Sequence, residues 1–291
     1  MSIKQLSVTS KKNTVSSAHT GQFSNLNFSI PKTIVATCLS AALLTGCQTS
    51  SRTLKTNPKA AVATRTALAA EYIRSGDLDA AKRNLDEALS TDSKSIEANN
   101  MMGVLLQQEG SASNMLLAET YFKRAVAIDP TYAQARNNYG VYLNGRKRYN
   151  EAIVQLKVAG ATLGYDGRGA ALENLGRTYV QVNDLVNAEK TFRQALQANR
   201  DSLIAKLELA EIFLQKNQLR DASGIYNDYL RNIGNQQQGA RSLWLGIRIA
   251  RTERDNIRMN NFINQLSAQY PNSTEYQKYL QLQKNPEAVW K

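Results

Sequence analysis

Histidine and cysteine are scarce in this sequence of 291 residues, and their scarcity limits its chemistry. There is one histidine, His19, and there are two cysteines, Cys38 and Cys47. All three precede residue 48, so the remaining chain offers no imidazole and no thiol. Zinc sites, Cys/His pairs and Ser/His/Asp triads depend on these groups. We therefore expect no such centre, and no disulfide, after residue 47.

Acidic residues are absent from the first 32 positions, which do carry lysines. An apolar run over residues 34–44 follows, and about a dozen residues are too few for a permanent membrane-spanning helix. The run ends in the small residues Thr45 and Gly46, just before Cys47. A basic start, a short apolar run and small residues at its end predict a secretory signal peptide over residues 1–46, which is removed.

The end of this segment, Leu44-Thr45-Gly46-Cys47, resembles the bacterial lipobox, Leu-x-Gly/Ala-Cys. The resemblance implies that Cys47 is lipidated: its sulfur takes a diacylglyceryl group, and its new amino terminus takes a further acyl chain such as palmitate. Gln48 follows where an aspartate could stand, which implies export onward to the outer membrane. The alternative is that Cys47 is a buried free cysteine near the start of the chain.

A helical pattern centred on residues 118–143 organises the rest of the chain. Ala118, Phe122 and Ala125 recur at helical spacing, and Asp129-Pro130 marks the end of that helix. The next helix brings the sequence Tyr-Gly-x-x-Leu at residues 139–143. This arrangement is typical of the tetratricopeptide repeat (TPR), a pair of helices with a small-beside-large contact.

Related patterns return at the TPR period of about 34 residues. They predict an all-α fold: a TPR solenoid of six helix-turn-helix repeats, wound as a right-handed superhelix, with a C-terminal capping helix. The predicted repeats cover 62–272, as 62–95, 96–132, 133–168, 169–202, 203–238 and 239–272. We expect a lipidated, flexible tether over 47–61 and the capping helix and tail over 273–291.

Three departures from the repeat pattern carry expectations of their own. About three extra residues between Gly110 and Ala118 predict a longer loop inside the second repeat. Tyr229 stands where alanine is usual, which predicts a looser helix contact. The sixth repeat is basic, and we expect its arginines to form a solvated face or to meet acidic lipid or an acidic partner segment. These arginines are Arg241, Arg248, Arg251, Arg254 and Arg258.

The first helices of the repeats are expected to line a groove, because their other faces are used in helix packing. Residues offset from the packing positions are Ile73, Val104, Val141, Val180, Ile204, Leu207, Leu214, Leu243 and Ile247, together with Asn100, Asn137, Glu173 and Arg177. An apolar lining with interspersed amides suits an amphipathic helix or an extended peptide. Alternatively, several of these side chains pack against neighbouring helices.

Several segments resemble the type IV pilus pilotin lipoproteins (the PilF/PilW group) in order over residues 62–282. They read ARNNYGVYL, ALENLGRTYV, ARSLWLGIRIAR and YPNSTEYQKY. The resemblance implies an outer-membrane lipoprotein that faces the periplasm, binds subunits of the pilus secretin, and promotes their localisation and multimerisation. Pilus biogenesis and twitching motility would depend on it. The groove of the early repeats is the contact region in this group, which nominates Ile73, Val104, Val141, Asn100, Asn137 and Val180 as partner contacts.

Other functions remain open on the sequence alone. A TPR lipoprotein adaptor for peptidoglycan hydrolases or for β-barrel assembly would share the lipobox and the fold. An enzyme is not expected, because no two carboxylates are paired as glycoside hydrolysis requires. We expect no metal, no cofactor other than the covalent lipid at Cys47, no nucleic-acid partner and no small-molecule substrate.

Overall fold

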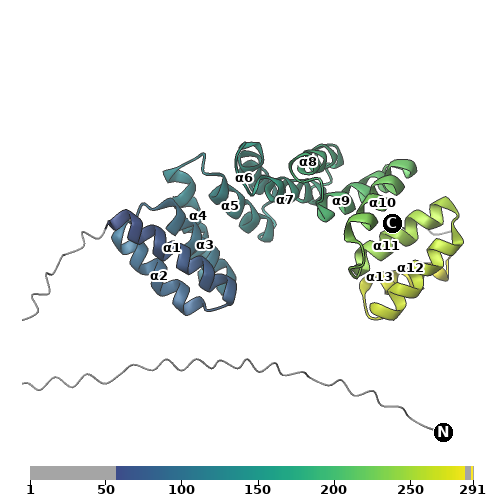
Figure 1. Cartoon of the computed structure of the whole chain (residues 1–291), viewed down its shortest axis with the longest axis horizontal. Helices are drawn as coiled ribbons and strands as arrows, with labels where there is room; N and C mark the ends of the chain where they lie inside the picture. The colour runs from purple at the N-terminus through teal and green to yellow at the C-terminus, as the bar shows by residue number, and fades with distance from the viewer. Residues whose placement is uncertain (1–56, 286–289, 291) are drawn as a thin grey trace, which may run out of the picture. The chain divides into compact units, whose positions relative to one another are not determined.

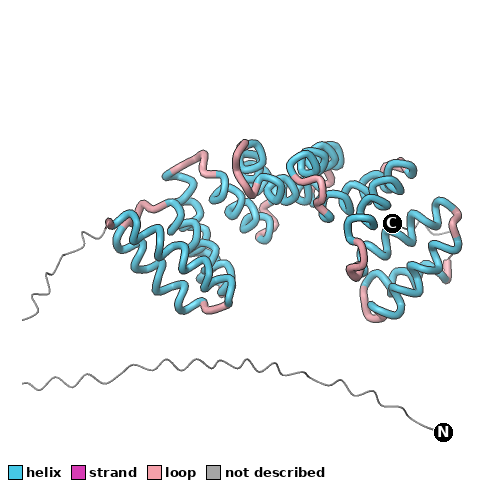
Figure 2. Tube along the Cα trace, in the orientation of Figure 1, coloured by secondary structure: helices cyan, strands magenta, loops and turns pink. Residues whose placement is uncertain are grey.

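The computed structural model describes residues 57–285 and Trp290, which belong to one compact unit of the chain, residues 55–291. The described residues form helices and no strand, and the predicted all-α TPR fold is confirmed (Figures 1 and 2). The helices are α1 (Pro58–Ser75), α2 (Leu78–Thr91), α3 (Ile96–Glu109), α4 (Ala112–Ile128), α5 (Ala133–Gly145), α6 (Tyr149–Ala161), α7 (Arg168–Gln181), α8 (Leu185–Ala198), α9 (Leu203–Gln215), α10 (Leu219–Ile233), α11 (Ala240–Glu253), α12 (Asn256–Gln269) and α13 (Thr274–Gln283). Cys47 and the predicted signal peptide lie outside the described residues.

A single left-handed residue shapes the turn between the two helices of each pair. In the first two pairs that residue is a glycine, Gly76 or Gly110, with φ of 84° and 74°. In the other four it is a residue with a side chain: Lys147, Asn183, Asn217 and Arg254, all with φ near 60°. Left-handed backbone reverses the chain within two or three residues, and the short turns hold the paired helices side by side (Figure 2).

In four of the six helix pairs, the packing depends on a glycine of the first helix that faces a large residue of the second. A β-carbon added to Gly103 would lie 2.8 Å from the ring of Phe122. One added to Gly176 would lie 2.7 Å from the ring of Phe192. Both rings are fully buried, and glycine is the residue that lets the helix backbone approach them. The bulky-Gly pattern in the sequence therefore has a direct steric cause.

Tyr229 is accommodated by stacking on the ring of Tyr226, and it is buried. The side chain is 5% exposed, and its ring lies 5.8 Å from that of Tyr226 with 17° between their planes. Tyr226 also donates its hydroxyl to the backbone oxygen of Ser242. The stacked pair of tyrosines thus reaches the sixth helix pair through Tyr226.

Two sequence expectations are wrong at element boundaries. The tether was expected to reach residue 61, but α1 begins at Pro58, because Asn57 caps it by accepting from the backbone N–H groups of Lys59 and Ala60. The extra residues of the second repeat lengthen α4 and do not lengthen the loop. Ser111 caps that helix immediately after Gly110, so the insertion is helical from its start.

The last helix, α13, packs against α11 at the end of the array. Tyr279 is buried there, and Tyr276 stacks on it at 6.0 Å. Such a helix covers the apolar side of the final repeat, which has no following repeat to cover it. Among residues 57–285 and Trp290, no helix is long and apolar enough to cross a membrane.

Candidate partner-binding face

The first helices of the pairs form a continuous layer. Each of α1, α3, α5, α7 and α9 packs against the first helix of the next pair as well as against its own second helix. We call the open side of this layer the first-helix face. Side chains from consecutive repeats lie next to one another on it, so a partner segment could contact several repeats at once.

Two hollows lie on the early part of this face. The larger, of about 550 Å³, is lined by α1 and the start of α3, with Tyr132 and Gln134 at its edge. The smaller, of about 260 Å³, is lined by Val104, Gln107, Gln108, Asn138 and Val141. Aliphatic side chains and amides line the smaller hollow, and apolar and charged side chains line the larger one. A peptide can meet such surfaces with apolar and polar groups together.

Val104 and Val141, two of the predicted contact residues, are brought together in the smaller hollow. Val141 is 36% exposed, whereas Val104 is partly buried against the core. Val180 is also partly buried, on the last turn of α7. Their role as partner contacts stays a prediction, but the side chains of Val104 and Val141 do line a hollow of the first-helix face.

The predicted open placement is wrong for Ile73, Leu243 and Ile247, which are 7%, 0% and 0% exposed. The last turn of α1 is covered by α3, whose Gln108 donates to the backbone oxygen of Ile73. Helix α11 contacts α9, α10, α12 and α13, so aliphatic side chains on most of its sides are enclosed. At these positions the alternative, packing against neighbouring helices, is correct.

Asn100 and Asn137 belong to a chain of four hydrogen-bonded amides. Asn174 donates to Asn137 at 3.1 Å, Asn137 to Asn138 at 3.4 Å, and Asn138 to Asn100 at 3.1 Å. Asn100 is only 1% exposed, so it serves as an acceptor inside the protein and offers little surface to a partner. The chain links α3, α5 and α7 across the first-helix face.

Sequence reasoning missed Asn138 and Asn174, although the repeats contain the signal. Asn138 lies two residues before Gly140, and Asn174 lies two residues before Gly176. Each acceptor, Asn100 or Asn137, lies three residues before the glycine of its own repeat. Each donor, Asn138 or Asn174, lies two residues before the glycine of the next repeat. Aligning the repeats on their glycines would have paired these amides.

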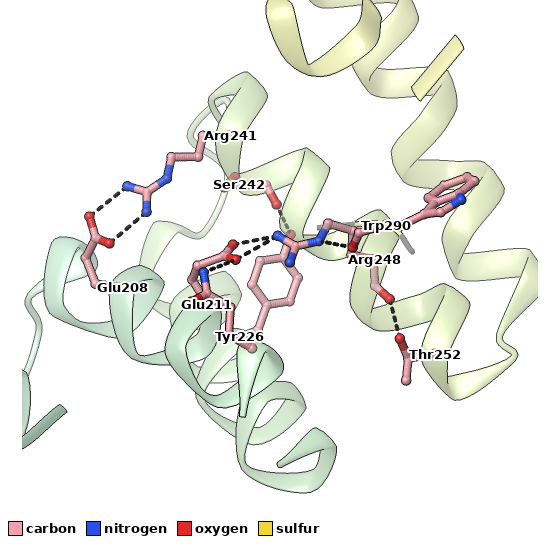
Figure 3. A network of polar contacts seen from close by, with 9 residues as sticks. Glu208, Glu211, Tyr226, Arg241, Ser242, Arg248, Thr252 and Trp290 are labelled. Atoms are coloured by element: carbon pink, nitrogen blue, oxygen red, sulfur yellow. Dashed lines mark hydrogen bonds and ion pairs between the residues drawn. The ribbon is translucent and has the colours of Figure 1, made fainter. Parts of the chain in front are cut away.

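Charged side chains replace the amides on the later part of the face. Arg241 forms two hydrogen bonds of 2.7 Å with the carboxylate of Glu208 (Figure 3). Arg177 approaches the same carboxylate at 3.5 Å. Glu208 is 5% exposed, so its charge is buried and depends on these partners. The hydrogen bonds that Arg241 donates to Glu208 raise the pKa of Arg241.

The expectation of a solvated arginine face in the sixth repeat is wrong for most of its arginines. Arg248 binds Glu211 at 2.8 Å, and Arg258 donates to Asn227 at 2.5 Å while lying over the Phe262 ring. The guanidinium of Arg251 lies 4.0 Å from the centre of the Trp290 ring. These arginine side chains contact carboxylates and aromatic rings of the protein itself. Sequence composition alone does not identify such partners.

Comparisons with known proteins bear on what this face does. Residues 179–243 match the model of the tetratricopeptide repeat family. The type IV pilus assembly protein PilF of Pseudomonas aeruginosa is 34% identical over 246 residues, which cover 83% of this chain and 95% of that protein. The chain belongs to the PilF family.

Solved structures agree with this assignment. A structure of Pseudomonas aeruginosa PilF matches with a TM-score of 0.71 and 31% identity, covering 77% of this chain and 98% of that one. PilW, described as a widely conserved type IV pilus biogenesis factor, matches with a TM-score of 0.65 and 28% identity, covering 75% and 98%. The matched TPR proteins, PilF and PilW, are described as type IV pilus assembly or biogenesis proteins, and this chain shares their fold.

The PilF-family chain shows no grouping of three His, Cys, Asp or Glu side chains that could hold a metal ion, within residues 57–285 and Trp290. Three of the carboxylates with a lowered pKa, Glu119, Glu151 and Glu189, are engaged by cations. Burial alone would raise the pKa of Glu119, but hydrogen bonds from Lys123 and Arg148 outweigh it and lower that pKa to about 2. Glu119 is thus a structural anion between α4 and the α5–α6 turn.

Proposed function

We propose that this PilF-family chain is a pilotin: an outer-membrane lipoprotein, facing the periplasm, that binds subunits of the type IV pilus secretin. It escorts them to the outer membrane and promotes their multimerisation, so that pilus biogenesis and twitching motility depend on it. The protein acts by binding and not by catalysis. The observation that carries the proposal is the hollow in which Val104 and Val141 meet amides of neighbouring repeats, on a member of a pilus assembly family.

The chemistry of this hollow suits a peptide segment better than a small molecule. Val141 supplies exposed apolar surface, and Gln107, Gln108 and Asn138 supply both donors and acceptors for a peptide backbone. The neighbouring amide chain fixes the orientation of Asn138, because its amide both donates and accepts. A pre-oriented amide loses less entropy when a segment binds, which favours a defined register.

The proposed anchor is a lipid on Cys47. A single acyl chain binds membranes only marginally, whereas two or more hold a protein stably at the bilayer. A lipidated Cys47 would keep the first-helix face next to the membrane in which the secretin assembles. Cys47→Ser should therefore leave the helical domain folded but abolish labelled palmitate incorporation, and equal incorporation by the variant would refute the anchor.

The deciding experiment compares outer-membrane fractions with and without this gene. We expect the secretin to lose its denaturant-resistant multimer and to be misplaced when the gene is deleted. An unchanged and correctly placed multimer would contradict the pilotin proposal. In that case pull-downs with peptidoglycan hydrolases and β-barrel assembly components would test the adaptor function.

The hollow is tested by Val141→Glu, which places a charge on its exposed apolar wall. We expect secretin binding to weaken at least about tenfold, with little change in thermal stability. Val154→Glu is the matched control, because Val154 is 57% exposed on α6, a second helix. Equal losses in both variants, or none in Val141→Glu, would place the binding site elsewhere.

A further inference from the structure

One side of α11 carries Arg241, Trp244, Arg248 and Arg251 at helical spacing, and we call these four residues the α11 stripe. Trp244 lies two residues before Gly246, the position that Asn138 and Asn174 hold in their own helices. The α11 stripe therefore belongs to the first-helix face, at the opposite end of the array from the hollow of Val104 and Val141.

Trp290 contacts three residues of the α11 stripe, Trp244, Arg248 and Arg251. Its ring stacks on Trp244 with centroids 5.7 Å apart and 17° between the planes. The Arg251 guanidinium lies 4.0 Å from the centre of the Trp290 ring, and Tyr279 meets that ring edge-on at 6.0 Å. Stacking, a cation over the ring and an edge contact together form a receptor for an aromatic side chain.

The backbone of Trp290 is recognised as well as its ring. Arg248 donates from Nε to the backbone oxygen of Trp290 at 2.8 Å, while its Nη1 group holds Glu211 (Figure 3). The Glu211 carboxylate fixes the guanidinium plane, so the Nε–H direction is set independently of Trp290. The α11 stripe thus contacts two features of its occupant, an aromatic ring and a backbone carbonyl oxygen.

The fit of Trp290 is incomplete. Its indole Nε1 atom is buried and has no hydrogen-bond partner among the described residues. A buried donor without a partner weakens docking, because unfolding the contact returns that donor to water. Closure of the solenoid end does not require Trp290, since α13 already packs against α11. Trp290 therefore behaves as a replaceable occupant.

We propose that the α11 stripe is a peptide-docking site, which the chain's own Trp290 occupies in the free protein. Its displacing ligand is a partner segment that presents an aromatic side chain beside its backbone carbonyl. Phenylalanine suits the site better than tryptophan, because it brings no N–H group into the buried position. The inference goes beyond the pilotin proposal: it concerns the sixth repeat and holds whichever protein supplies the segment.

The test uses the compact unit, residues 55–291, with the substitution Trp290→Ala. A fluorescent peptide with the sequence of residues 284–291 is titrated in and its anisotropy measured. We expect saturable binding, at least about tenfold tighter than to the unsubstituted protein, in which Trp290 competes. A peptide with phenylalanine at the tryptophan position should bind more tightly, and one with alanine should not bind.

Two arginine variants in the Trp290→Ala background separate the site from general charge. Arg248→Lys keeps a cation beside Glu211 but removes the Nε donor, and should weaken peptide binding about tenfold. Arg254→Lys is the matched control on an exposed arginine outside the stripe, and should leave binding unchanged. The absence of saturable binding in the millimolar range overturns the proposal. Peptide binding that is unchanged by Arg248→Lys, or unchanged by Trp290→Ala, also overturns it.

A second measurement needs no substitution. The sequence contains two tryptophans, and both are in the stacked pair. Displacement of Trp290 by the phenylalanine peptide should change the near-ultraviolet circular dichroism of the unsubstituted protein while leaving its helical signal intact. An unchanged near-ultraviolet spectrum in the presence of millimolar peptide would overturn the displacement even if Trp290→Ala fails to fold.

Discussion

At the residue scale, the partly buried carboxylate of Glu119 shows how a single side chain can connect two repeats. Lys123, Arg148 and Tyr139 all approach its Oε1 atom, at 2.8, 2.8 and 3.2 Å. Arg148 also binds Glu151 with two further hydrogen bonds. Helices from the second and third repeats therefore share one charge cluster, and the partial burial of Glu119 makes the cluster matter for stability.

The low pKa of Glu119, about 2, predicts a pH dependence. Its contribution to stability is complete above the unfolded value near 4.5 and is lost as pH falls through about 2. Glu119→Gln should cost about 1–3 kcal/mol of unfolding free energy at pH 7 and progressively less below pH 4. Urea unfolding at several pH values measures this, with Asp166→Asn, at an exposed position outside the charge cluster, as control. A deficit that does not shrink in acid would contradict the assigned pKa.

The glycine contacts give a second prediction at this scale. Gly176→Ala should destabilise the protein by about 1–3 kcal/mol, because its β-carbon would press on the buried Phe192 ring. Gly224→Ala is the matched control: Gly224 lies in α10, and an added β-carbon meets nothing within 4 Å. That change should stabilise by up to about 1 kcal/mol through helix propensity. Thermal melts that rank the two variants the other way would contradict the steric explanation.

At the element scale, the turns and helix ends decide where repeats differ. The sequence predicted the helix pairs because Gly103, Phe122, Gly176 and Phe192 occupy positions that only one packing satisfies. It did not predict the extra turn of α4, because residues 112–117 fit a loop or a helix equally well until Ser111 is seen to cap them. It also missed the amide chain, which depends on alignment between repeats and not on any one repeat.

The left-handed turn residues predict an element-scale effect. Lys147 adopts φ of 60° in an exposed turn, where a β-carbon is unfavourable. Lys147→Gly should raise stability by up to about 1 kcal/mol, and Asn183→Gly should raise it less, because asparagine tolerates this conformation. Chemical denaturation of both variants compares them. A loss of stability in Lys147→Gly would mean that the turn is not left-handed in solution.

At the scale of the whole molecule, stability is spread along the array and not concentrated in one core. The extensive contacts of each described helix pair are with its neighbours in sequence. Composition alone predicted a solvated arginine face in the sixth repeat. The partners of Arg241 and Arg248 are Glu208 and Glu211 on α9, which become evident only when α9 is placed beside α11. In such arrays, each repeat is stabilised by its own contacts and its interfaces.

This architecture predicts graded protection from hydrogen exchange. Amides of α5 to α10, which have repeats on both sides, should exchange most slowly, and those of α1, α2, α12 and α13 should exchange fastest. Mass spectrometry of exchanged peptides measures the gradient. Uniform protection from α1 to α13 would show that the described helices unfold as one cooperative unit.

The division of the first-helix face into an amide half and a charged half has a consequence for ionic strength. Neutral amides around Asn138 interact with a ligand almost independently of dissolved salt, because they carry no net charge. The half that contains Glu208 and Arg241 is different, since added ions weaken its attraction for any charged segment. A partner held at both ends would therefore detach first from the later repeats as salt rises, while the early repeats keep their hold.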